Sequence, residues 1–74
     1  MDQQQVETRV VEIANINNSG TPYTLSTTWG SPLDTVELIM KFEEEWDSLE
    51  GTLQEASAGW STLQDAANHI FNNL

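Results

Sequence analysis

The apolar spacing between Trp29 and Trp46 constrains this chain more than any other feature. In WGSPLDTVELIMKFEEEW, apolar residues recur at the three- and four-residue intervals of a helix with one buried face. The predicted apolar positions are Leu33, Val36, Ile39 or Met40, Phe42 and Trp46. Ser31 suits an N-cap, Pro32 is tolerated at the first helical position, and Asp34 stands in capping-box position. We therefore predict a helix over residues 31–47 with an acidic opposite face.

Two further helical patterns flank this segment. Residues 2–16 begin at Asp2, with Gln5 at the third position, and continue with Val6, Val10, Ile13 and Ile16. Residues 61–72 offer Ser61 or Thr62 as the N-cap, Gln64 or Asp65 as the capping-box partner, and an apolar stripe of Leu63, Ala66, Ala67 and Ile70. Residues 53–58 predict a short helix or a single turn. Together these patterns predict one domain, residues 1–74, with an all-α fold: a small three- to four-helix bundle.

The connection over residues 17–30 carries three large side chains, Tyr23, Leu25 and Trp29, spaced through Thr and Ser. It contains no second run with which a β-hairpin could form. We predict an ordered loop whose aromatic residues cover the core, and we prefer this packing role for Tyr23 and Trp29 to a ligand-binding role.

Charge narrows the classes of partner. Twelve acidic residues face two basic ones, Arg9 and Lys41, which gives a net charge of −10. This balance disfavours nucleic acid and anionic membrane surfaces and favours basic proteins or divalent cations. The chain has no cysteine, no apolar run that could span a membrane, and a polar start at Met1–Gln5 unlike a signal peptide. We expect a cytoplasmic monomer.

Catalysis has little support in the sequence. His69 is the only histidine, so neither a histidine-based metal site nor a catalytic triad can form, and no glycine-rich phosphate loop is present. We expect no enzymatic activity, no metal site, and a structural role for His69.

The acidic side of the 31–47 helix is a candidate recognition surface. Glu37 and Lys41 form an i,i+4 pair, whereas Glu43, Glu44 and Glu45 oppose the helix dipole, so helix stability alone does not explain them. Met40 is either a core residue or a docking contact beside these acids. The predicted partner-binding residues are Asp34, Glu37, Met40, Glu43 and Glu44. Weak Ca²⁺ or Mg²⁺ binding by Glu43, Glu44, Asp47 and Glu50 is an alternative, although they lack the loop of a dedicated site.

The run LDTVELIM at residues 33–40, followed by Phe42-Glu43-Glu44-Glu45-Trp46, resembles the recognition helix of bacterial acyl carrier proteins. Ser61-Thr62-Leu63-Gln64-Asp65-Ala66 with Ile70 is similar to the closing segment of that family, and Val6–Val10 is loosely similar to its opening helix. The resemblance implies a four-helix carrier domain of fatty-acid or polyketide metabolism. Its interior could shelter an acyl chain, and its second helix would dock on basic surfaces of carrier-dependent enzymes.

The resemblance fails at the attachment serine. The family carries 4′-phosphopantetheine on the serine of a D-S-L motif, and in ungapped register that serine is replaced by Pro32. If one residue has been deleted, Ser31 is the nearby hydroxyl, and a phosphate there would be favoured by a helix N-terminus. Two functions therefore stay open: a working carrier modified at Ser31, and an unmodified interaction module. A module unrelated to acyl transfer is the further alternative.

Overall fold

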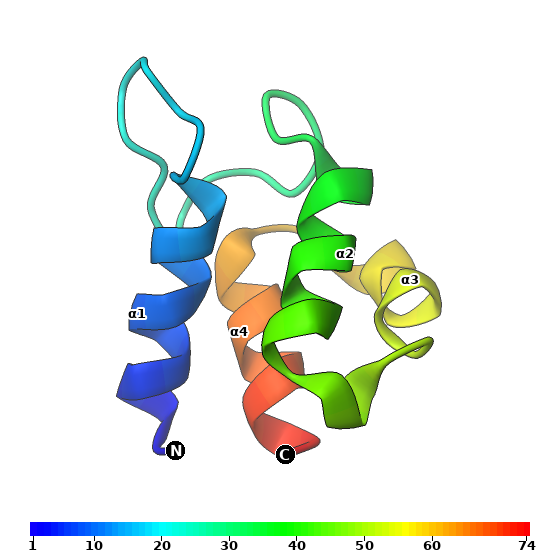
Figure 1. Ribbon diagram of the computed structural model, residues 1–74. Helices are drawn as coiled ribbons and strands as arrows, with labels where there is room; N and C mark the ends of the chain where they lie inside the picture. Colours follow the sequence, from blue (N-terminus) through cyan, green and yellow to red (C-terminus); the bar gives the residue numbers. More distant parts are fainter.

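The computed structural model describes all residues, 1–74, and contains four α-helices and no strand. The α-helices are α1 (Gln3–Ala14), α2 (Thr35–Glu45), α3 (Leu53–Ala56) and α4 (Leu63–Asn72), with two short 3-10 turns, η1 (Asp47–Leu49) and η2 (Ser57–Gly59). α1 and α2 stand side by side in front of α4, and α3 lies on the other side of α2 (Figure 1). The predicted all-α fold, a small helical bundle, is confirmed.

The starts of α1 and α4 are set by local hydrogen bonds. Asp2 accepts a hydrogen bond from the Gln5 amide at 2.8 Å, and the Gln5 side chain accepts one from the Asp2 amide at 2.9 Å. In α4 the N-cap is Thr62, and the Asp65 carboxylate accepts from the Ser61 and Thr62 amides at 2.7 and 3.3 Å. Each cap satisfies amides that have no partner inside the helix. The capping boxes predicted for α1 and α4 are confirmed.

One hydrophobic core lies between the helices. Its largest fully buried side chains come from α1, α2, α3 and α4: Val6, Val10, Phe42, Leu53, Leu63 and Ile70. The helical spacing predicted for α1 and α4 holds except at Ile16, which is 58% exposed beyond the end of α1. The predicted residues 2–16 were therefore two residues too long at the C-terminal end, where Asn15 caps α1.

The predicted start of α2 was wrong. Its N-cap is Asp34, whose carboxylate accepts a hydrogen bond from the Glu37 amide at 3.2 Å, and the helix begins at Thr35. Ser31 and Pro32 lie in the turn before it. Gly30 has a φ of 121°, which reverses the chain there, and Leu33 is buried in the core. Because Leu33 fills the core from this turn, the helix starts after it rather than before it.

The predicted apolar face of α2 was wrong at Val36 and lacked Leu38, and of the alternatives Ile39 and Met40 the structure buries Ile39. Leu38, Ile39 and Phe42 are buried, whereas Val36 and Met40 are 61% and 59% exposed. The helix ends at Glu45, and Trp46 is buried just past its end. The helix packs against α1 on one side and α3 on the other, and these neighbours decide which side is buried.

The connection between α1 and α2 is held in place by hydrogen bonds. The Asn15 side chain accepts from the Tyr23 amide at 2.9 Å and donates to the Tyr23 carbonyl at 3.1 Å. The Trp29 amide donates to the Ser61 carbonyl at 2.9 Å, which fixes the loop beside the start of α4. The Trp29 ring lies 4.9 Å from Trp60 and 6.4 Å from Phe42 between centroids. Tyr23 and Trp29 pack against the core, as the packing interpretation predicted.

None of the helices combines the length and the apolar character that crossing a membrane requires.

Candidate functional site

Most of the acidic side chains have a partner inside the chain. Asp2, Asp34 and Asp65 bind amides at helix starts. The Glu7 carboxylate on α1 accepts a hydrogen bond from the side-chain nitrogen Nε2 of Gln64 on α4 at 2.7 Å. Glu37 lies 3.4 Å from Lys41, which confirms the predicted i,i+4 pair. Each of these carboxylates therefore has at least one partner within the chain.

Two of the three glutamates at the end of α2 are also bound, by segments distant in the sequence. The Glu43 carboxylate accepts from the Gly51 and Leu53 amides at 2.9 and 3.1 Å, and so ties α2 to the start of α3. Glu45 accepts from Arg9 of α1 at 2.8 Å. This hydrogen bond is the main reason why the pKa of the Arg9 guanidinium is raised above its ordinary value. Glu43, predicted as a partner-binding residue, thus has an intramolecular role.

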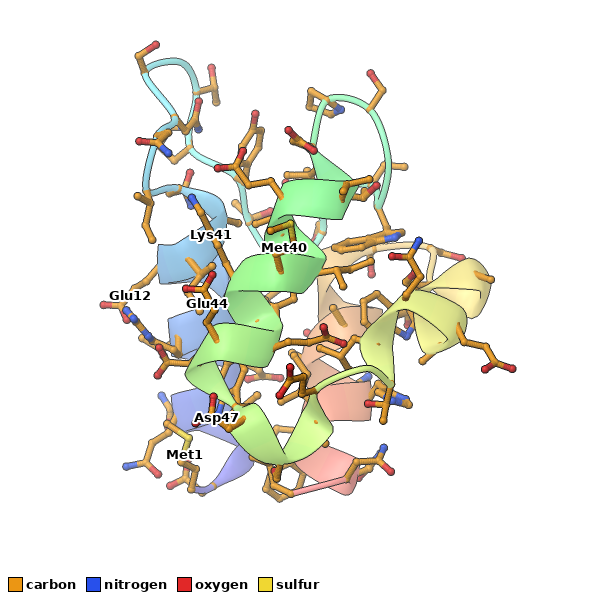
Figure 2. All side chains as sticks on the ribbon, turned by 45° about the vertical axis from the view of Figure 1, so that its right-hand side comes forward. Met1, Glu12, Met40, Lys41, Glu44 and Asp47 are labelled. Carbon is orange, nitrogen blue, oxygen red and sulfur yellow. The ribbon has the colours of Figure 1, made fainter.

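Four acidic side chains remain without a hydrogen bond or ion pair, and three of them are neighbours. Glu44, Asp47 and Glu50 surround Met40, and together with Glu43 they line an open hollow of about 260 Å³. Met40, Glu44 and Asp47 lie along one outward side of α2 and the turn that follows it (Figure 2). We call Val36, Met40, Glu44, Asp47 and Glu50 the Met40 face.

Met40 is 59% exposed, so it is not a core residue. Its role as a docking contact stays a prediction. Of the predicted partner-binding residues, Met40 and Glu44 lie on the Met40 face, whereas Asp34, Glu37 and Glu43 have partners within the chain. The sequence assigned Val36 to the apolar face and named Asp47 and Glu50 only as candidate cation ligands, whereas the structure exposes Val36 and brings the two acids beside Met40. The spacing of Val36, Met40, Glu44 and Asp47, at four, four and three residues, would have placed these four on one face once Val36 was taken as exposed.

Ser31, the candidate attachment residue, is exposed and caps no helix. It lies three residues before the N-cap Asp34, in the turn that also exposes Pro32. Its hydroxyl is therefore accessible, but it does not stand at the helix start where the resemblance places the modified serine.

His69 is the only histidine of the chain. It is half-buried in the last turn of α4, with its ring centroid 5.7 Å from that of Trp60. No group of three or more His, Cys, Asp or Glu side chains is arranged to hold a metal ion. The Met40 face is thus the candidate site with the clearest chemistry.

No protein-family model matches this chain, and no solved structure matches it significantly.

Proposed function

We propose that this chain is an acidic protein-interaction domain, similar to acyl carrier proteins, which docks through the Met40 face onto a basic surface of an acyl-carrier-dependent enzyme. One observation carries the proposal: an exposed methionine stands among three carboxylates that have no partner within the chain. Unpaired carboxylates add repulsion at the C-terminal end of a helix, so their arrangement favours binding to another molecule.

The chemistry of the face selects the kind of partner. Met40 and Val36 supply adaptable apolar area at the centre, and the acids around Met40 supply the polar border common at protein interfaces. A second copy of the chain would bring another net charge of −10 and be repelled. Basic side chains are therefore the complementary group. The assignment to acyl-carrier-dependent enzymes rests on the resemblance of residues 33–46.

The test is a binding assay between the purified chain and a panel of carrier-dependent enzymes, including a ketosynthase with a basic carrier-docking surface. Glu44→Lys and Asp47→Lys should each weaken binding by about two- to ten-fold, and rising salt should weaken it further. Glu55→Lys is the matched control. Glu55 is exposed on α3, and its replacement makes the same charge change outside the Met40 face.

Two results would count against the proposal in different ways. Equal loss of affinity in Glu44→Lys and Glu55→Lys would show attraction to overall charge rather than docking on this face. Binding to basic proteins but to none of the carrier-dependent enzymes would leave an acidic interaction module unrelated to acyl transfer.

A working carrier is the second candidate, and the exposure of Ser31 favours it. Incubation with coenzyme A and a broad-specificity phosphopantetheinyl transferase, followed by intact mass measurement, separates the two functions. The unmodified module predicts an unchanged mass while an active carrier control is modified. A gain of one phosphopantetheine that disappears in Ser31→Ala would establish the carrier instead.

A further inference from the structure

A second hollow, of about 240 Å³, opens where the end of α1 meets the turn before α2. It is separate from the Met40 face, because the residues that line the two hollows do not overlap. Its apolar part comes from four buried side chains: Ile13, Ala14, Leu33 and Leu38. Tyr23 lines it from the connecting loop. We call it the Tyr23 hollow.

The loop at its edge is held by side-chain hydrogen bonds. Asn15 binds both backbone groups of Tyr23, at 2.9 and 3.1 Å. Asn18 donates to the Thr21 carbonyl at 2.9 Å and to the Asn15 side chain at 3.0 Å. These contacts fix the wall before any ligand arrives, which lowers the entropic cost of binding.

The charges at the rim favour a cation. Asp34 and Glu37 line the Tyr23 hollow, and Lys41 is the only basic residue that does so. The Lys41 ammonium already lies 3.4 Å from Glu37, and the chain as a whole carries −10, so an anion would meet repulsion. One Asp34 oxygen accepts from the Glu37 amide, and the other is free to accept from a ligand.

We propose that the Tyr23 hollow binds a primary alkylammonium group. The alkyl chain packs against Tyr23 and the small apolar area that the four buried side chains leave open, and the ammonium donates hydrogen bonds to Asp34 and Glu37. A primary amine of this kind is charged at neutral pH, as lysine is. The hollow lies a little below the range of about 300–1,000 Å³ typical of drug-sized ligands, so it suits a chain of roughly four to six carbons.

The test follows backbone amide signals by NMR while n-butylammonium and n-hexylammonium are titrated into the chain. Signals of Asn17, Asn18 and Leu38 should shift with a dissociation constant on the order of 1 mM, tighter for the longer chain. Hexanoate and hexanol have the same alkyl body with the opposite charge or none, and both should bind more weakly. Equal binding of the three six-carbon compounds, or no shift at these residues, would overturn the proposal.

Two variants test the carboxylates without removing the fold. Asp34→Asn keeps an N-cap acceptor for α2, and Glu37→Gln keeps the shape of the side chain. Each should weaken n-hexylammonium binding by about two- to five-fold. Glu44→Gln makes the same charge change on the Met40 face and should leave binding unchanged. Unaltered affinity in both Asp34→Asn and Glu37→Gln would refute recognition by these carboxylates.

The alkylammonium group has two natural sources, a lysine of a protein and a free amine. Nα-acetyl-lysine N-methylamide carries the n-butylammonium group on a peptide backbone. Binding as tight as that of n-butylammonium assigns the hollow to protein lysines, and markedly weaker binding assigns it to free amines; both results support the site.

Discussion

Glu43 provides a sharp test of the structure, because its neighbour Glu44 is a matched control. In Glu43→Ala, the Gly51 and Leu53 amides lose the carboxylate that accepts from them at 2.9 and 3.1 Å. Water can replace it at the exposed Gly51 amide but less readily at the partly buried Leu53 amide. Losing the charge-assisted hydrogen bond to the partly buried Leu53 amide, together with the weaker one to the exposed Gly51 amide, should lower the free energy of unfolding by about 1–2 kcal/mol.

This loss is measurable against the roughly 3–5 kcal/mol expected for a core of this size. It corresponds to a fall in Tm of about 4–16 °C for a domain of this length. The assay is urea and thermal unfolding, followed by circular dichroism and by the fluorescence of the three tryptophans. Glu44→Ala gains the same helix propensity but loses no hydrogen bond, so it should stay within about 0.5 kcal/mol of the parent.

The comparison between the two variants carries the conclusion. Glu43→Gln keeps an acceptor oxygen and should fall between Glu43→Ala and the parent. If the free energies of unfolding of Glu43→Ala and Glu44→Ala differ by less than about 0.3 kcal/mol, Glu43 does not link α2 to α3. It would then belong with the unpaired acids of the Met40 face.

Three further predictions follow from the helix cap, the core and the only ion pair between helices. Asp34→Ala should cost about 1 kcal/mol of unfolding free energy in urea titrations, while Ser31→Ala stays within about 0.5 kcal/mol, because Asp34 is the cap; the reverse order would restore Ser31 as the cap. Phe42→Ala should cost about 3–5 kcal/mol and leave the chain largely unfolded by circular dichroism, since Phe42 is fully buried; a cooperative transition near the parental Tm would contradict this. Arg9→Gln should lower the urea midpoint at low salt but not in about 1 M NaCl, where the Debye length is roughly 3 Å, because its contact to Glu45 is exposed; a salt-independent loss would indicate a packing role.

Outside the start of α2, local interactions between residues within about four positions of each other could be predicted from the sequence. The capping boxes of α1 and α4 join residues three apart, and the Glu37–Lys41 pair joins residues four apart. The all-α fold follows from the same local patterns, because α1, α2 and α4 each carry a capping residue and a helical apolar spacing.

The candidate site was only partly predictable, because burial depends on remote partners. Val36 and Met40 fit an apolar helical face as well as Leu38 does, and only the positions of α1 and α3 decide which of them is buried. Glu43 and Glu44 are adjacent and chemically identical, yet only Glu43 reaches the Gly51 and Leu53 amides.

The sequence by itself thus determined the helical class, the cap of the first helix, two candidates for the cap of the last helix, and the acidic character of the chain. Tertiary structure alone decided where α2 begins, since Leu33 enters the core from the turn after Gly30 and leaves Asp34 as the cap. It also decided which acids are free to meet a partner. The physical reason is the same in both cases: helix caps and spacing are short-range properties of the chain, whereas burial and the pairing of charges depend on segments that meet only in the folded molecule.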